Sequence, residues 1–310
     1  MYTESSQKMH LVEVGPRDGL QNEPETVPTG AKLDLIDTMI GYGARRIEVA
    51  SFVHPKRVPQ MADAEAVIAG LPDLADTTYI GLTLNKRGLM RALATREAGP
   101  KDGKGRGIDQ AGCVIVASDT FGQKNQGQTI AQGIAENRDM LRFAKAEGLS
   151  AQVTISAAFG CPFEGAVKPE TVLTIAEELA AETPAEIALA DTIGVGVPSQ
   201  VGDLFGALGE LLGDAIPMRC HFHNTRGTGI ANAWAAYQNG VRIFDASLGG
   251  LGGCPFAPKA TGNIATEELI YMMHNSGIDT GIDLAAAIAA NHSFARVLGR
   301  ELPSLVAKAA

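Results

Sequence analysis

The chain has 310 residues, of which 45% are hydrophobic and 20% charged, and its formal net charge is -9. This acidic balance excludes a typical nucleic-acid-binding domain, which carries a basic patch, and no apolar run approaches the ~20 residues of a membrane helix. Four cysteines and a start without a charged and apolar leader do not suggest a secreted disulfide framework, so we expect a cytoplasmic globular protein.

Eight short runs of apolar and β-branched residues recur along the chain, and each predicts a β-strand. They cover residues 9–14, 45–50, 77–82, 112–117, 151–156, 186–190, 217–222 and 241–247. Their ends fall 25 to 39 residues apart. A βα unit needs about 30 residues, and a parallel strand buried on both faces is continuously apolar. The rhythm therefore predicts parallel strands joined by helices.

The segments between these runs show helical periodicity, as at Leu33, Ile36 and Ile40. Eight alternating strands and helices in a chain of this length predict an α/β fold of the TIM (β/α)8 type, with the active site at the carboxyl ends of the strands. We expect one catalytic domain over residues 1–310, with C-terminal helices at about 263–298 packed on the barrel. A doubly wound sheet shares the alternation, but no GxGxxG fingerprint follows the first strand.

The segment Gly99–Gly112 interrupts this rhythm, because it is rich in glycine and carries three basic residues that would suit a phosphate. It lies between the third predicted helix and the fourth predicted strand. In a barrel such a connection lies on the face opposite to the active site. We therefore interpret it as a solvated surface loop.

Chemically active side chains gather near the ends of the predicted strands, where a TIM barrel builds its active site. They are Arg17 and Asp18 after the first strand, Glu48 in the second, Ser118 after the fourth, Cys161 after the fifth, Asp191 after the sixth, His221 and His223 at the seventh, and Cys254 and Asn263 after the eighth. Polar groups within apolar runs are unfavourable unless they are satisfied. Their positions therefore indicate a functional site.

The most specific single pattern is His221-Phe222-His223, because alternate residues on a strand point to the same side. Two imidazoles and the carboxylate of Asp18 would form a site for a divalent cation, to which Asn263 could add a neutral oxygen. Such a mixed nitrogen and oxygen set suits Mg, Mn or Co better than structural zinc. The alternative is two histidines that are satisfied by backbone groups near a strand end.

Cys254 lies in the glycine-rich segment GGLGGCPFAP, whose glycines allow a backbone shape closed to other residues. A thiol carried on such a loop could donate a proton or act as a nucleophile. An inert thiol on a tight turn is the alternative. Cys113 and Cys220 lie inside strand runs and are expected in the core, whereas the role of Cys161 stays open.

Five segments carry a resemblance to one family: VEVGPRDGLQNE at 12–23, IEVASFVHPKRVPQMAD at 47–63, GCPFEG at 160–165, ADTIGVGVP at 190–198 and GLGGCPFAPKATGNIATEELIYM at 250–272. Through them the chain resembles the hydroxymethylglutaryl-CoA lyases, which are metal-dependent TIM barrels, from about residue 8 to residue 298. Condensing relatives such as the isopropylmalate synthases share the RDG, the HxH and the asparagine. They usually carry an added C-terminal regulatory region.

The resemblance implies retro-Claisen cleavage of 3-hydroxy-3-methylglutaryl-CoA to acetyl-CoA and acetoacetate, with Mg or Mn, or else Co, as the cation. The implied ligands of the cation are Asp18, His221, His223 and Asn263. The implied catalytic residues are Arg17 at the thioester oxygen, Cys254 as the acid that protonates the enolate, and Glu48 and Asp191 as orienting groups. The base for the hydroxyl proton is Asp18 or His221, and the two stay open.

The residues expected to contact the substrate are Arg17, Gln21, Ser118, Asn224 and Arg226. The family usually reads HDTYG where this chain reads HNTRG, and a tyrosine is frequent where this chain has Thr154. These departures suggest a changed acyl pocket, so the same chemistry on a different 3-hydroxyacyl-CoA is the main alternative. A condensing synthase and a barrel that binds acyl-CoA without turnover are the others. The resemblance also implies a homodimer, with an acyl-CoA as the partner and no nucleic acid or membrane.

Overall fold

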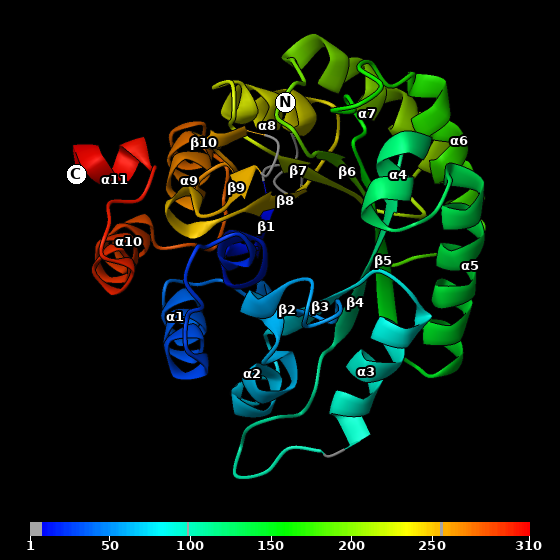
Figure 1. Cartoon of the computed structure of the whole chain (residues 1–310). Helices are drawn as coiled ribbons and strands as arrows, with labels where there is room; N and C mark the ends of the chain where they lie inside the picture. Colours follow the sequence, from blue (N-terminus) through cyan, green and yellow to red (C-terminus); the bar gives the residue numbers. More distant parts are fainter. Residues whose placement is uncertain (1–7, 98, 255–256) are drawn as a thin grey trace.

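The computed structural model describes residues 8–97, 99–254 and 257–310. Eight parallel strands close into a barrel in the order in which they follow along the chain (Figure 1). They are β1 (His10–Glu13), β2 (Arg46–Ser51), β3 (Thr78–Thr83), β4 (Gln110–Val116), β5 (Ser150–Ser156), β6 (Ile187–Asp191), β7 (Met218–Phe222) and β8 (Ile243–Ala246). Because β1 pairs with both β2 and β8, the predicted TIM barrel is confirmed and the doubly wound sheet is excluded.

Helices surround the barrel (Figure 1). They are α1 (Thr29–Gly41), α2 (Ala64–Gly70), α3 (Lys86–Glu97), α4 (Asp119–Asn125), α5 (Ile130–Ala146), α6 (Pro169–Ala180), α7 (Pro198–Leu212), α8 (Gly229–Gln238), α9 (Thr266–Asn275), α10 (Leu284–Leu298) and α11 (Leu305–Ala309). Helices α9 and α10 occupy the region expected to hold C-terminal helices, and α10 packs against α1. The C-terminal helix α11 packs on α9 and α10 (Figure 1). Within the described ranges, no helix has the length and apolarity needed to cross a membrane.

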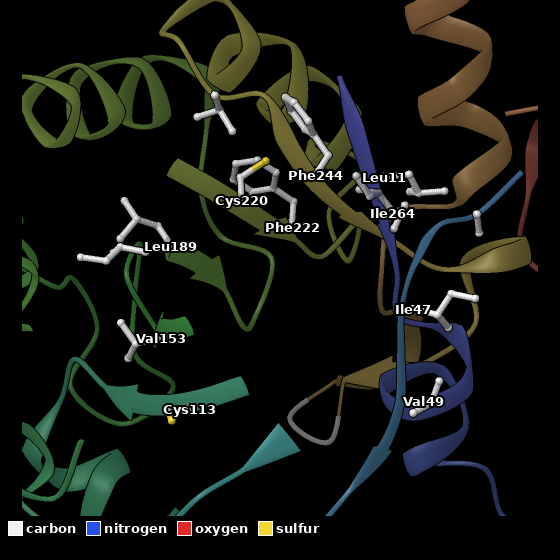
Figure 2. Close-up of a cluster of buried hydrophobic side chains, with 14 of the residues drawn as sticks. Leu11, Ile47, Val49, Cys113, Val153, Leu189, Cys220, Phe222, Phe244 and Ile264 are labelled. Atoms are coloured by element: carbon white, nitrogen blue, oxygen red, sulfur yellow. The ribbon is translucent and has the colours of Figure 1, made fainter. Parts of the chain in front are cut away.

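The strands bury two faces of different character. Cys220, Phe222 and Phe244 belong to a large hydrophobic cluster between the strands and the helices (Figure 2). Because strand residues alternate, Arg219 and His221 of β7 face the barrel interior instead. The expectation that Cys113 and Cys220 are core residues is confirmed, since both are fully buried. The strand pattern thus places polar side chains on the inside, where they can form a site.

Helix α1 packs the predicted residues against the core, but the centre of its buried face is shifted from the one that periodicity predicted. Ile36 is buried, but Leu33 and Ile40 are only partly buried. Lys32 is buried instead, because its ammonium pairs with a carboxylate oxygen of Asp63 at 2.5 Å. The partner comes from another segment of the chain, so apolar spacing within the helix could not reveal this placement.

The glycine-rich connection between α3 and β4 lies at the amino end of β4, as expected. It is shorter than predicted, because β4 already begins at Gln110. The expectation of a fully solvated loop is wrong for Arg106. Its guanidinium donates hydrogen bonds to the carbonyls of Leu74 and Thr77 and pairs with Asp109 at 2.9 Å. Arg106 therefore anchors the loop to the barrel and is not available to a phosphate.

Candidate active site

A cavity of about 350 Å³ lies at the carboxyl ends of the barrel strands. One side of it is polar and is formed by residues Arg17, Asp18, Glu48, His221, His223 and Asp245. The other side is formed mainly by apolar residues of β3, β4 and α4, namely Leu82, Val114, Val116 and Phe121. Gln21, expected at the substrate, also lines the cavity.

A single turn of π-helix, Gly15–Gly19, carries Arg17 and Asp18 into the cavity directly after β1. Such turns are rare and are frequent at functional sites. Only glycine fits at its start, since a Cβ on Gly15 would lie 2.9 Å from a carboxylate oxygen of Glu13. The backbone shape of the GPRDG motif therefore places two charged side chains side by side at the mouth of the barrel.

Arg17 joins two carboxylates across the polar side of the cavity. Its Nε and Nη2 donate to Oε2 of Glu48 at 2.8 and 2.5 Å, and its Nη1 donates to Oδ1 of Asp18 at 2.5 Å. Burial would raise the pKa of Asp18, but the charge of Arg17 outweighs burial and holds that pKa well below its usual range. Asp18 is therefore an anion throughout the physiological range.

Asp18, His221 and His223 converge as the sequence predicts. Each offers a ligand atom, and these three atoms lie within 4.8 Å of one another. Nε2 of His221 lies 3.9 Å from Oδ2 of Asp18, and the two imidazole rings are 5.2 Å apart between centroids. The three residues come from the turn after β1 and from the end of β7, which are not neighbouring strands.

Asn263 reaches this group from the segment that follows β8. Residues Asn263 and His223 form an antiparallel bridge, and Nδ2 of Asn263 donates to Oδ2 of Asp18 at 2.8 Å. Gly252 is close to this side chain, since a Cβ there would lie 2.8 Å from Nδ2 of Asn263. The four predicted ligand residues are therefore in one place.

The donor set fits a divalent cation. Within the described ranges, the buried atoms Oδ1 of Asn263 and Nδ1 of His223 have no hydrogen-bond partner, and such buried polar atoms are normally satisfied. Burial lowers the pKa of His223 to about 4, so this imidazole is neutral at pH 7 and has a free lone pair. One carboxylate, two imidazoles and an amide oxygen suit a cation such as Mg or Mn.

Two buried carboxylates, Glu13 at the end of β1 and Glu267 in α9, hold the segment that leads to Cys254. Glu13 accepts hydrogen bonds from the backbone N–H of Leu248 at 2.9 Å and from the hydroxyl of Thr266 at 2.7 Å. Glu267 accepts the N–H of Gly249 at 2.9 Å, and burial raises the pKa of Glu267 to about 8. The start of the glycine-rich segment is therefore rigidly attached to the barrel and to α9.

Cys254 belongs by its backbone to a two-stranded antiparallel sheet, β9 (Gly253–Cys254) and β10 (Ala257–Thr261), and not to an irregular loop. Its side chain lies outside the part of the chain that the structure describes. The neighbouring Gly253 lines the cavity, and its carbonyl accepts a hydrogen bond from Asn22 at 3.1 Å. The backbone of this hairpin thus reaches the edge of the cavity beside the turn after β1.

Two predicted site residues, Ser118 and Asp191, form hydrogen bonds with backbone N–H groups of nearby segments. Ser118 caps α4 by accepting the N–H of Phe121 at 3.2 Å, and its hydroxyl lies 3.0 Å from the sulfur of Cys161. Asp191 accepts the N–H groups of Val195 and Gly196 at 3.0 and 2.8 Å. Neither Ser118 nor Asp191 is among the described residues that line the cavity. Both side chains shape the loops around the site, and Cys161 supports the first of these loops.

Asn224 and Arg226 were expected to contact the acyl group, and both lie in the loop between β7 and α8. Arg226 donates to the backbone carbonyls of Ile193 and Gly194, both at 2.9 Å. Asn224 accepts the N–H of Gly229, the first residue of α8, at 3.1 Å. Neither side chain is among the described residues that line the cavity. The HNTRG departure therefore contributes to the structure of this loop.

The sequence analysis missed Arg219 and Asp245, which both line the cavity from inside the barrel. They are 1% and 4% exposed. The sequence did contain a signal for both, because each is a charged residue within an apolar strand run. Strand alternation also places Arg219 on the same side as His221 and Asp245 on the side that faces the interior. Thr154, whose departure from the family pattern suggested a changed acyl pocket, does line the cavity, whereas Asn125 and Gln126 line it without having been predicted.

Comparison with known proteins gives a consistent result. A profile of the HMGL-like family matches residues 8–293. The chain is 42% identical to the (R)-citramalyl-CoA lyase of Chloroflexus aurantiacus, over 96% of this chain and 94% of that protein. It is 40% identical to the cytoplasmic 3-hydroxy-3-methylglutaryl-CoA lyase of Danio rerio, over 96% of this chain and 86% of that protein.

A solved structure resembles the whole barrel. It is an HMG-CoA lyase from Acinetobacter baumannii in complex with coenzyme A and 3-methylmalate. The TM-score is 0.91 at 39% identity, and the match covers 99% of this chain and 97% of that one. The likeness therefore extends over the barrel and the C-terminal helices together.

Proposed function

The chain belongs to the HMGL-like family, and from this premise we propose that it is a divalent-cation-dependent lyase that cleaves 3-hydroxy-3-methylglutaryl-CoA to acetyl-CoA and acetoacetate. One observation carries the proposal: the ligand atoms of Asp18, His221 and His223 lie within 4.8 Å of one another, at the cavity that Arg17 also lines. An acyl-CoA substrate is supported by the coenzyme A in the Acinetobacter relative. The homodimer and the cytoplasmic location stay predictions.

The residues of the site match what the reaction needs. When bound, Mg or Mn would act as a Lewis acid on the hydroxyl and the carboxylate of the substrate. Asp18, His221, His223 and Asn263 would hold it. Arg17, oriented by two hydrogen bonds to Glu48, would donate to the thioester oxygen as negative charge develops there.

The proton steps use groups on the polar side of the cavity. Asp18 or His221 would accept the hydroxyl proton as the bond between C2 and C3 breaks. The electron pair of that bond remains on the acetyl-CoA fragment as an enolate, whose oxygen Arg17 stabilises. The thiol of Cys254 would then protonate C2. One proton leaves the hydroxyl and one reaches carbon, so the overall reaction is balanced.

A second candidate substrate is citramalyl-CoA, which the relative at 42% identity favours. This thioester carries its carboxylate directly on the hydroxyl-bearing carbon, so the same bond cleavage would release acetyl-CoA and pyruvate. The catalytic groups would be unchanged. The choice between the two would depend on the wall formed by Leu82, Val114, Val116 and Thr154, which lies opposite the ligand residues.

One experiment tests the chemistry and separates the substrates. Acetyl-CoA release is measured with both thioesters, after chelation and again after addition of Mg or Mn. We expect no turnover in the chelated protein and recovery with either cation. Acetoacetate or pyruvate as the second product, and the ratio of kcat/KM, identify the preferred acyl group. Full activity without a cation would refute the proposal.

A further inference from the structure

The two histidines of the HxH motif are held in different ways. Nδ1 of His221 lies 3.0 Å from Oδ2 of Asp245. Nδ1 of His223, by contrast, is a buried atom without a hydrogen-bond partner within the described ranges. Both rings are nearly buried, with 9% and 7% of the residue exposed, so solvent does not account for the difference. Of the two rings, His221 alone has a hydrogen-bond partner at Nδ1 among the described residues.

Asp245 is itself held by Arg219. Nε of Arg219 donates to Oδ1 of Asp245 at 2.5 Å, and Nη2 donates to Oδ2 at 2.9 Å. The pair joins the adjacent strands β7 and β8 inside the barrel. A bidentate guanidinium compensates the charge of a buried carboxylate and leaves it ionised. Asp245 is then an acceptor only, with Oδ2 shared between Arg219 and His221.

This arrangement determines the proton of His221. An ionised carboxylate cannot donate, so a contact of 3.0 Å requires that Nδ1 of His221 carries the hydrogen. A neutral imidazole protonated at Nδ1 has its lone pair at Nε2. Nε2 is the atom that lies 3.9 Å from Asp18, on the side of the predicted cation.

We propose that Asp245 and Arg219 are a positioning pair that holds His221 in its Nδ1–H form, with the lone pair of Nε2 directed at the cation. The part that concerns the cation rests on the proposed function, whereas the part that concerns the tautomer does not. Carboxylates that orient a ligating histidine in this way raise its basicity and fix its ring. Neither residue touches the substrate in this proposal.

The same barrel contains a matched ion pair that does not reach the histidines. Glu186 pairs with Arg46 near the amino ends of the strands, and it lies 3.9 Å from Nη1 of Arg219. The side chain of Glu186 is as buried as that of Arg219. Glu186→Gln therefore disturbs a buried charge network without removing a partner of His221. It is the control for a purely structural effect.

The decisive variant is Asp245→Asn, which keeps the shape of the side chain. Because Arg219 offers only donors, the amide oxygen should turn to Arg219 and the NH2 group to His221. Nδ1 must then accept, and the proton moves to Nε2. In metal-free protein labelled with nitrogen-15 at histidine, at an alkaline pH where the imidazole is neutral, we expect the NMR signals of one histidine to change from the Nδ1–H to the Nε2–H pattern.

Cation affinity supplies the second measurement. Titration with Mn, followed by electron paramagnetic resonance, should show affinity about 10- to 100-fold lower in Asp245→Asn, as for other residues that orient a metal ligand. Glu186→Gln should keep both the tautomer and the affinity. Arg219→Met should shift both measurements in the direction of Asp245→Asn, and Arg219→Lys should restore part of the affinity.

The outcomes separate the positioning of His221 from the proposed function. An unchanged tautomer in folded Asp245→Asn, or equal losses of affinity in Asp245→Asn and Glu186→Gln, would overturn the positioning pair. A natural protein that binds no Mn would overturn the proposed function together with the cation part of this inference. A tautomer change in that same experiment would still establish that Asp245 holds the proton of His221.

Discussion

The two sides of the cavity are built on different principles. On the side of β1, β7 and β8, each charged group is held by another, as Arg17 is by Glu48 and His221 is by Asp245. On the side of β3, β4 and β5, the wall consists of Val114, Val116 and other mainly apolar side chains. The difference indicates that reactivity depends on rigid ionic contacts, whereas selectivity depends on the volume and polarity of the opposite wall.

The largest loss of activity is expected when the charged side of the cavity loses the carboxylate of Asp18. Asp18→Asn keeps the volume of the side chain but removes the carboxylate shared by Arg17 and the histidines. We therefore expect the protein to lose the cation and its Lewis-acid contribution of several kcal/mol, which lowers kcat/KM by about 10³-fold or more. Acetyl-CoA release and Mn titration measure both. Asp214→Asn on the exposed surface serves as the control. Normal Mn affinity in Asp18→Asn would contradict the proposed ligand set.

The next largest loss of activity is expected when Arg17 keeps its positive charge but loses the planar shape of its guanidinium. Arg17→Lys keeps a cation, but a lysine cannot reproduce the planar fork that contacts both Glu48 and Asp18. We expect kcat to fall by about 10²- to 10³-fold, as when a donor to a developing oxyanion is removed. Mn affinity should change far less than in Asp18→Asn. A kcat near that of the natural protein would show that Arg17 does not act on the thioester oxygen.

The proposed proton donor, Cys254, provides a third test. In Cys254→Ser a far weaker acid replaces the proposed proton donor, so we expect turnover to fall by about 10²-fold with the fold retained. Cys161→Ser is the matched control, because Cys161 is a buried thiol in the loop after β5 and accepts backbone N–H groups at 3.4 Å. Circular dichroism checks the fold of both variants. Equal turnover in the two would return Cys254 to the role of an inert thiol.

The smallest effect is expected on the apolar side, where the substrate is selected. Thr154→Tyr reduces the cavity volume, and a change of a methylene or more in such a wall shifts selectivity by about 10- to 200-fold. We expect the ratio of kcat/KM for the methylglutaryl and citramalyl thioesters to change, with the Mn affinity retained.

A double variant at the rim sharpens the same comparison. Asn224→Asp with Arg226→Tyr should leave this ratio unaltered, because the side chains contact backbone groups of the neighbouring loops. It should lower the melting temperature, since the two hydrogen bonds of Arg226 are lost. A changed substrate ratio in this double variant would show that the rim also selects the acyl group.

The barrel and much of its polar side were predictable from the order of residues along the chain. Apolar runs at the spacing of a βα unit define eight strands, and alternation within one strand places His221 and His223 on one side. The GPRDG motif likewise predicted charged groups after β1. These features depend on neighbouring residues in one segment, which is why local periodicity was sufficient to find them.

Tertiary structure decided which partner each polar side chain takes. Ser118, Asp191, Asn224 and Arg226 are close in sequence to site residues, yet each binds backbone groups and none is among the described residues that line the cavity. Asp245, which no motif indicated, lies on β8 and contacts His221 on the adjacent strand β7. Such contacts join segments that are far apart in sequence, and closure of the barrel brings those segments together. No local pattern encodes the distance between their atoms, so only the folded molecule could reveal them.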